Sequence, residues 1–369
     1  MILFYRINID KINMFNMSHN LLAEFESLST QEWKQKIEKY LKGKSYDSIV
    51  CKVDEDIEIQ PFYRVENSFT ELPVLSDNQW LISESFHWGS AADTNKAILN
   101  ALENAVNSIN LLADSAKTED LIAMLDSVYL NMIELNICGD APEQNPPEWI
   151  EAISKLKDIQ NCRGSFSFSR NNEKLHAELS GFPEALKNWT LFNISIDLSA
   201  NSITQSFSEG LKETTACFDM LLKHGFDADQ AQSKIKYTFQ TGDDYFLNIA
   251  AVRAFKRLWL GILEGYEVKN AIYPKIHAVT NPTLNDPYLN MISNTSQALS
   301  VAIAQVSSIE VSPSDSNATD FSRRIARNVQ NLLKLESHID QVSDASSGSY
   351  YIENYSAAIS KKTWKLFTS

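Results

Sequence analysis

Imidazole, amide and carboxylate side chains lie in or directly after several apolar segments of this sequence, where they could exchange protons or hold a ligand. His277 lies in the apolar segment 275–280, and Gln240 and Asp243 lie at and just after the end of segment 234–240. A histidine exchanges protons near neutral pH, and a carboxylate can act as a general base. These three residues are weak catalytic candidates, because nothing in the sequence pairs a nucleophile with a base. The wider set of polar residues at segment ends comprises Glu84, His87, Asp114, Asn136, Asp140, Asp197, Thr280 and Ser312.

Motifs for nucleotides, metals and activated nucleophiles are missing from the sequence. The eleven glycines form neither GxGxxG nor GxxxxGK, which argues against a dinucleotide fold and a P-loop. The chain also contains no GxSxG and no HExxH. Its four cysteines, at 51, 138, 162 and 217, form no CxxC pair, so we expect neither a metal site nor a disulfide framework.

Composition indicates a folded globular protein. Hydrophobic residues make up 44% of the 369 residues and charged residues 22%. A net charge of −14 argues against a role in nucleic-acid binding, which requires clustered cations. We expect no membrane span and a cytoplasmic location, because no apolar run is long enough and the thiols suit a reducing compartment. Residues before Met17 are expected to be an overextended start or an unstructured lead.

Eight apolar strand-like segments alternate with helical segments from Trp80 onwards. Such a series predicts an α/β fold of the (β/α)₈ TIM-barrel type with an N-terminal extension, because the sheet closes at eight strands. A doubly wound sheet is less favoured, since it usually has fewer strands. The expected strands are 80–86, 108–113, 131–138, 164–169, 192–197, 234–240, 275–280 and 308–312. The expected helices include 95–106, 147–156, 206–223, 245–264 and 288–304.

Apolar and polar residues alternate within these strands. Successive side chains point to opposite faces of a strand, so we expect the apolar set to face the helices and the polar set to face the barrel axis. Barrels of this type usually fill the axis with Val, Ile and Leu. Two interpretations remain open: a hydrated or self-paired polar interior, and a tunnel that admits part of a ligand. The lumen candidates are Ser85, Asn136, Ser167, Ser195, Thr238 and Ser312.

The two ends of the chain carry further helix signals. Thr319 is the expected N-cap of an amphipathic helix that continues to about Glu336, and a strand-like run at 350–352 follows a turn. Ser29 and Glu32 form a Ser-x-x-Glu capping box before a helix, and the segments 46–53 and 56–59 look like short strands. We therefore divide the chain into an N-terminal arm (1–72), a barrel (73–345) and a C-terminal tail (346–369).

Several segments of the sequence resemble the barrel domain of the methylmalonyl-CoA mutase family. The resemblance spans nearly the whole chain from Leu21 and is densest after Lys234. It is carried by the segments 33–43, 59–63, 241–259, 277–280, 286–290, 320–330, 336–338, 342–344 and 348–353.

The resemblance implies a radical rearrangement between methylmalonyl-CoA and succinyl-CoA on adenosylcobalamin, with the acyl-CoA passing along a lumen of small polar side chains. Many bacterial members are heterodimers of a catalytic large subunit and a related small subunit. Three departures from the catalytic pattern point to the small subunit. Residues 62–69 lack the Arg-Gly-Pro-Tyr segment that engages the substrate, Ser199 and Ala200 stand where a Tyr-His pair is expected, and no Asp-x-His-x-x-Gly motif follows the barrel.

We therefore expect a non-catalytic small subunit that stabilises a methylmalonyl-CoA mutase heterodimer, with the cobalamin bound by the large subunit and none by this chain. The arm 21–69 is expected to wrap the partner. A cobalamin-type domain would follow the tail, and we expect this chain to be either naturally short or cut before it. The alternatives are a stand-alone barrel enzyme that uses His277, Gln240 and Asp243, and an acyl-CoA-binding module.

Overall fold

The computed structural model describes residues 28–54, 57–64, 72 and 78–369. The chain divides into two compact units, residues 1–51 and 52–369, and each is described by itself. The apolar segment 21–25 and the residues around Met17 lie outside the described residues, and the boundaries predicted at 72 and 345 stay predictions.

Helix α1 (Thr30–Tyr40) opens the described part of the first unit. The predicted capping box is confirmed, because Ser29 Oγ accepts from the Glu32 amide at 3.2 Å and the Glu32 carboxylate accepts from the Ser29 amide at 2.7 Å. None of the residues of α1 is buried. The strand predicted over 46–53 is wrong in its first half, which is the 3₁₀ helix η2 (Tyr46–Ile49). Ser45 accepts from the Asp47 amide and so starts a tight turn instead of a strand.

A two-stranded sheet, β1 (Cys51–Asp54) and β2 (Ile57–Ile59), precedes the barrel in the chain. Ile57 and Ile59 of β2 are buried while Glu58 between them is exposed, which is the alternation of a half-buried strand.

The barrel sheet has nine parallel strands in the order β7-β6-β5-β4-β3-β11-β10-β9-β8. Leu191 alone separates β7 from β8; β7 pairs with β6 and β8 pairs with β9. The two pieces are therefore halves of one broken strand, and the predicted eight-stranded TIM barrel is confirmed. The strands are β3 (Leu81–His87), β4 (Ser108–Leu112), β5 (Glu134–Cys138), β6 (Arg163–Phe166), β7 (Trp189–Thr190), β8 (Phe192–Asp197), β9 (Ile235–Gln240), β10 (Lys275–Val279) and β11 (Ser308–Glu310).

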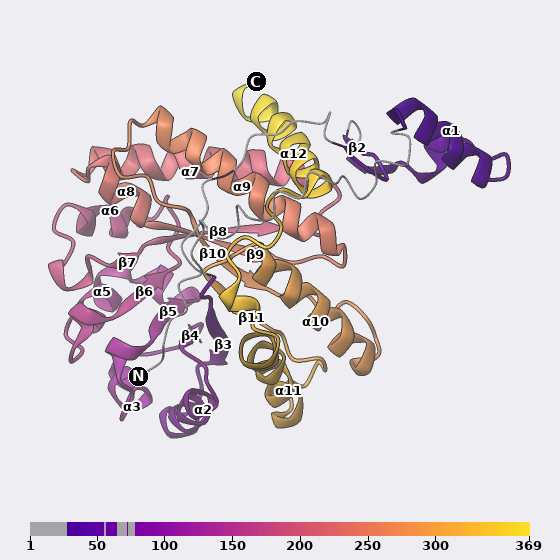
Figure 1. Cartoon of the computed structure of the whole chain (residues 1–369). Coiled ribbons are helices and arrows are strands. Elements are labelled where there is room, and N and C mark those ends of the chain that lie inside the picture. The colour runs from indigo at the N-terminus through magenta and orange to yellow at the C-terminus, as the bar shows by residue number, and fades with distance from the viewer. Residues whose placement is uncertain (1–27, 55–56, 65–71, 73–77) are drawn as a thin grey trace, which may run out of the picture. The chain divides into compact units, whose positions relative to one another are not determined.

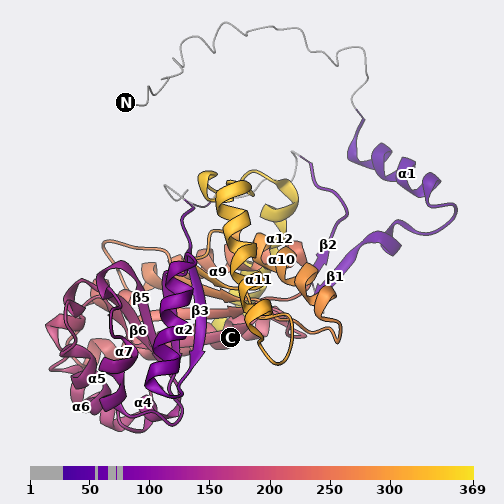
Figure 2. The same cartoon turned by 90° about the horizontal axis from the view of Figure 1, so that it is seen from below.

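Helices surround this ring of strands (Figure 1). The view turned by 90° shows α2 lying along β3 (Figure 2). None of the helices of the described residues is long and apolar enough to cross a membrane. The α-helices of the barrel unit are α2 (Ala91–Glu103), α3 (Leu121–Met124), α4 (Asp140–Gln144), α5 (Pro146–Ser154), α6 (Glu173–Leu179), α7 (Ile203–Lys223), α8 (Ala228–Ser233), α9 (Tyr245–Gly265), α10 (Pro287–Ile303), α11 (Asp320–Asn331) and α12 (Tyr350–Thr368). The short 3₁₀ and π segments are η3 (Thr118–Asp120), η4 (Leu130–Met132), η5 (Ile159–Asn161), η6 (Glu184–Leu186), η7 (Leu332–Glu336) and η8 (Ile339–Gln341).

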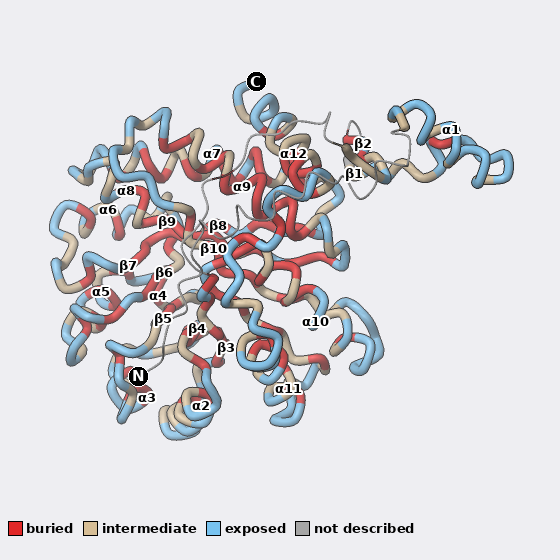
Figure 3. The backbone as a smooth tube through the Cα atoms, in the orientation of Figure 1, coloured by how far each residue is buried: buried red, intermediate tan, exposed pale blue. Residues whose placement is uncertain are grey.

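The apolar side chains of the strands face the helices, as the alternation predicts. The Tyr237 hydroxyl on β9 bonds the Thr214 hydroxyl on α7 at 2.7 Å, and the rings of Phe239 and Phe207 pack against each other. Buried residues accordingly follow the strands and the inner faces of the helices (Figure 3). The other members of the strands, mostly polar, face the barrel axis, whereas Glu84 on β3 points to α11.

The C-terminal segment contains one confirmed and one wrong prediction. Thr319 caps α11 by accepting from the Ser322 amide, as expected. The strand-like run at 350–352 is instead the first turn of α12, whose N-cap Ser349 accepts from the Ile352 amide. Ile352, Tyr355 and Ile359 are buried at helical spacing, so tertiary packing overrides the strand preference of two tyrosines and an isoleucine.

Candidate functional site

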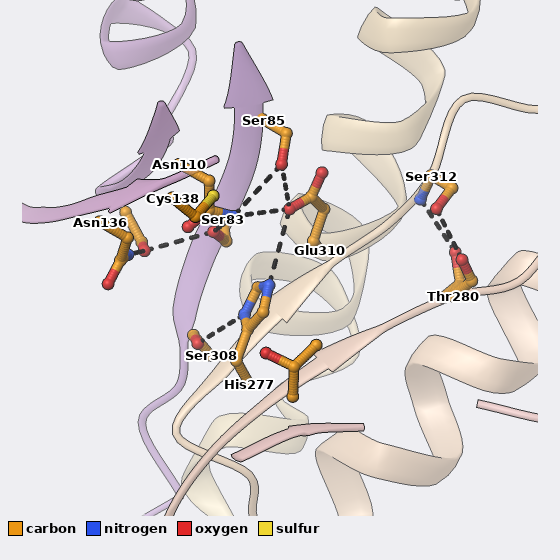
Figure 4. Close-up of polar contacts among 12 residues, drawn as sticks. Ser83, Ser85, Asn110, Asn136, Cys138, His277, Thr280, Ser308, Glu310 and Ser312 are labelled. Atoms are coloured by element: carbon orange, nitrogen blue, oxygen red, sulfur yellow. Dashed lines mark hydrogen bonds and ion pairs between the residues drawn. The ribbon is translucent and has the colours of Figure 1, made fainter. Parts of the chain in front are cut away.

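The barrel lumen contains a hydrogen-bonded layer around Glu310 on β11. Its Oε2 atom accepts from Ser85 Oγ at 2.8 Å and from Asn110 Nδ2 at 2.7 Å (Figure 4). His277 on β10 lies below it, with Nε2 3.6 Å from Glu310 Oε2 and Nδ1 2.9 Å from Ser308 Oγ. The layer thus joins strands β3, β4, β10 and β11 through side chains alone.

Glu310 stays a carboxylate in this buried position. Burial favours the neutral acid, but the contacts with His277, Ser85 and Asn110 outweigh it and lower the pKa of Glu310 below its ordinary value. A buried carboxylate with three polar neighbours stabilises the barrel interior and can also accept a proton.

A second layer of the lumen centres on Asn136 of β5. Its Oδ1 accepts from Ser165 Oγ at 2.5 Å and from Lys236 Nζ at 2.9 Å, while its Nδ2 donates to Ser108 Oγ at 3.2 Å. Strands β5 and β9 are not neighbours in the sheet, so the bond to Lys236 crosses the lumen. Ser108 in turn accepts from Ser83 at 3.2 Å.

A cavity of about 590 Å³ lies at the N-terminal end of the barrel, below the Asn136 layer. Glu134, Lys236 and His277 form part of its lining. Its cationic residues are Arg163, Lys236, Lys256, Lys275 and Lys334. Burial lowers the pKa of Lys236 and Lys275, and it lowers the pKa of Lys256 to about 7.

The three catalytic candidates do not form one cluster. His277 belongs to the lumen layers, whereas Asp243 accepts from Ser293 Oγ at 2.7 Å and Gln297 Nε2 at 2.9 Å, both on α10. Gln240 is exposed at the end of β9, two residues beyond Thr238, which pairs with His277. Asp243 therefore supports the loop after β9 against α10.

Four of the six lumen candidates have defined partners. Ser85 and Asn136 belong to the layers described above, and Thr238 donates to Asn193 Oδ1 at 3.0 Å. Ser312 donates to the Thr280 carbonyl at 2.6 Å, apart from the layers (Figure 4). Ser167 follows β6, and Ser195 lines a cavity of about 570 Å³ beside β8 and α7.

The remaining polar candidates are engaged in local structure or exposed. Glu84 points to α11, where it forms ion pairs with Arg323 and Arg327. The Asp114 carboxylate accepts from the Asp140 amide at 3.4 Å. His87 is exposed at the end of β3, and Thr280 Oγ1 accepts from the Ser312 amide.

Ser199 and Ala200 form a turn against Asp197 at the end of β8. The Ser199 amide and hydroxyl both donate to Asp197 Oδ1, at 2.8 and 2.6 Å. Across the described residues, no three His, Cys, Asp or Glu side chains gather as metal ligands would.

The alternation in the sequence placed Glu134 and Glu310 on the axis side of their strands, but sequence reasoning missed the two lysines of the lumen. Lys236 and Lys275 also occupy polar positions of alternating strands, so the alternation could have identified them. It could not show that Lys236 reaches Asn136 across the axis, because that contact depends on the closure of the barrel.

The described lumen fits the self-paired interpretation. The N-terminal cavity and a smaller one of about 180 Å³ near Glu310 share no lining residue. The Asn136 and Glu310 layers lie between the two cavities, and the side chains of these layers form hydrogen bonds with one another.

The family profile and the curated relatives point to one family. A family profile described as methylmalonyl-CoA mutase matches residues 196–369. The methylmalonyl-CoA mutase small subunit of Porphyromonas gingivalis is 30% identical over 96% of this chain and 65% of its own length. The small subunit of Streptomyces virginiae is 24% identical over 94% of this chain and 64% of its own length. That of Propionibacterium freudenreichii subsp. shermanii is 23% identical over 94% of this chain and 62% of its own length. The chain thus spans less than two thirds of the length of these relatives.

Proposed function

We propose that the chain belongs to the methylmalonyl-CoA mutase family and acts as the small, non-catalytic subunit of such an enzyme, on the similarity of residues 196–369 to the family profile and of 96% of the chain to a small subunit. Its role is to bind and stabilise a catalytic large subunit in a heterodimer in the cytoplasm. The small-subunit names of its relatives support this role. The reaction of the complex is the interconversion of methylmalonyl-CoA and succinyl-CoA.

The proposal places adenosylcobalamin, which supplies the radical chemistry when bound, on the large subunit. The carboxylates near the C-terminal ends of the strands are engaged within this chain. Glu84 is paired with two arginines, Asp197 holds the Ser199 turn, and Glu310 is buried among hydrogen-bond donors. No step of the reaction is therefore assigned to this chain.

The observation that carries the partner role is the exposed helix α1. None of its eleven residues is buried, and Tyr40 is 84% exposed. Trp33, Ile37 and Tyr40 lie at helical spacing on one side of α1, which is the pattern of a helix that packs on another surface. We assign that surface to the large subunit.

Coexpression with a cobalamin-binding large subunit tests the proposal. The purified chain alone should show no turnover of methylmalonyl-CoA with added adenosylcobalamin, and the copurified complex should be active. The double variant Trp33→Ser/Tyr40→Ser should weaken complex formation by roughly tenfold or more, because each lost aromatic anchor contributes about 1 kcal/mol or more.

Tyr129→Ser is the matched control, since Tyr129 is 74% exposed in the barrel unit and lies far from α1 in the sequence. This variant should assemble normally. Turnover by the chain alone would overturn the subunit role in favour of the stand-alone enzyme. Unchanged assembly of the double variant would overturn the role of α1.

A further inference from the structure

A serine hydroxyl, a histidine ring and a carboxylate lie in a row on the lumen side of β10 and β11. Ser308 Oγ lies 2.9 Å from His277 Nδ1, and His277 Nε2 lies 3.6 Å from Glu310 Oε2 (Figure 4). A nucleophile, a base and a carboxylate that orients the base are the groups that activate a serine. The sequence does not show this pairing, because 31 residues separate His277 from Ser308.

The strand register holds the three groups in place. His277 on β10 is the direct partner of Ser308 on β11. Glu310 follows Ser308 by two residues on the same strand, so both side chains point to the same face of the sheet. The row is therefore built on paired strands, which hold reacting groups more precisely than loops do.

The neighbours of His277 favour the tautomer that a general base needs. Glu310 stays a carboxylate, because its polar contacts lower its pKa, and a carboxylate only accepts hydrogen bonds. We therefore assign the ring proton to Nε2, which faces Glu310, so that Nδ1 accepts from the Ser308 hydroxyl. The distance between Nε2 and Oε2 is longer than a hydrogen bond, and such contacts often tighten when a substrate binds.

Ser308 and His277 both line the cavity of about 590 Å³ at the N-terminal mouth of the barrel. Lys236 and Lys275 line the same cavity, and ammonium groups stabilise the oxyanion that forms when a carbonyl carbon is attacked. Barrels of this type usually react at the opposite end, in the loops after the strands. Here the nucleophile is the first residue of β11, which places the row at the mouth.

We propose that this chain has an esterase site in which Ser308 is the nucleophile, His277 is the general base and Glu310 positions His277. Ser308 Oγ attacks the carbonyl carbon of a small carboxylic ester, and its proton moves to His277 Nδ1. The bond from this carbon to the leaving alcohol breaks, and the alcohol takes the proton. Water then gives a proton to His277 and attacks the acyl-serine, and the carboxylic acid leaves as Ser308 regains its proton.

Diisopropyl fluorophosphate tests for an activated serine, because such a hydroxyl displaces its fluoride. Mass spectrometry of peptides from the treated full chain should place the diisopropylphosphoryl group on Ser308. Ser308→Ala should not be labelled there, whereas Ser307→Ala should be labelled like the wild type. Ser307 is the matched control, because it lines the same cavity but its hydroxyl accepts from the Ile276 amide at 3.2 Å.

Hydrolysis of p-nitrophenyl acetate measures the activity. Ser308→Ala and His277→Gln should lower kcat by roughly 100-fold or more, since general base catalysis contributes at least about that factor. Glu310→Gln should lower kcat with KM little changed, in protein that circular dichroism shows to be folded. Glu310→Asp, which keeps the charge, should recover part of the loss.

Absence of the label on Ser308 would overturn the proposal, and so would equal hydrolysis by Ser308→Ala and Ser307→Ala. An unchanged kcat in Glu310→Gln would overturn the positioning role of Glu310. This inference goes beyond the subunit role and does not depend on it. Hydrolysis releases an acid and an alcohol without any rearrangement, so its failure would leave the subunit role unaffected.

Discussion

The lumen contains acidic and basic residues, and the fold places them in separate layers. Glu310 and His277 lie in the layer nearer the C-terminal ends of the strands, and Lys236 and Lys275 line the N-terminal mouth. Lys236 and His277 are buried and Glu310 and Lys275 are half-buried, so each of these polar groups depends on its neighbours for stability. Glu310 has three polar contacts, with Ser85, Asn110 and His277. A substitution there should therefore show how much these contacts contribute to stability.

Glu310→Gln should reduce the free energy of unfolding at pH 7 by about 1–3 kcal/mol, because the amide cannot replace the charged contacts to His277, Ser85 and Asn110. The pKa of Glu310 is lowered in the folded chain. Its stabilising contribution is therefore present above the unfolded pKa and is lost as the pH falls through the folded pKa.

Urea unfolding of both proteins at pH 7 and in steps below pH 4.5 measures this effect. The gap in unfolding free energy between wild type and Glu310→Gln should narrow as the pH falls. A gap that stays constant over that range would contradict a carboxylate role for Glu310. Glu151→Gln, on the exposed surface of α5, serves as a control with a small gap at every pH.

At the scale of elements, β6 depends on a glycine where three strands meet. Gly164 lies opposite Leu135 on β5 and Trp189 on β7. A Cβ atom at Gly164 would lie 2.3 Å from the Leu135 carbonyl oxygen and 2.6 Å from the Trp189 ring. Strand β7 pairs with β6 at this position and has only two residues. The pairing that continues the sheet beyond β6 is therefore short.

Gly164→Ala should cost about 3 kcal/mol or more of unfolding free energy, since neither the backbone oxygen nor the buried Trp189 ring can move aside. Thermal or urea unfolding checks the size of the loss. Gly181→Ala is the matched control, because no atom lies within 4 Å of a Cβ there and its effect should stay within about 0.5 kcal/mol. Equal stability of the two variants would show that β6 can shift.

For the barrel unit as a whole, α12 joins the end of the chain to α7 and α9. Ile352, Tyr355 and Ile359 are buried, and Glu353 forms ion pairs with Arg253 and Arg257 of α9. Asp344, in the loop before α12, also pairs with Arg253. Arg253 and Arg257 thus form ion pairs with two carboxylates from a later part of the chain, and these side chains are largely shielded from water.

Glu353→Gln should lower the free energy of unfolding of the full chain by about 3–5 kcal/mol, because it removes the buried carboxylate that pairs with both Arg253 and Arg257. Urea unfolding followed by circular dichroism measures the loss. Glu184→Gln, which breaks the exposed pair with Lys187, should change it by less than about 1 kcal/mol. A loss for Glu353→Gln as small as that of the control would rule out a structural role for the ion pairs.

Local patterns in the sequence determined the elements and their faces. The caps Ser29 and Thr319 fix helix starts through contacts within four residues, and the period-two alternation fixes which strand residues face the axis. Eight strand–helix units were enough to predict the barrel. The same local reasoning was wrong at 46–49 and at 350–352. At 46–49 the Ser45 side chain caps a 3₁₀ helix, and at 350–352 the burial of one face of α12 outweighs the strand preference of the residues.

Only the tertiary structure decided which polar residues meet. Asn136 and Lys236 lie 100 residues apart, and Ser85 and Glu310 lie 225 apart, so their bonds exist because the sheet closes. Closure also separates His277 from Asp243, which the sequence had grouped as candidates. The sequence alone therefore determined a barrel with a polar lumen, whereas the closed layers and the cationic mouth come from long-range contacts that local patterns do not encode.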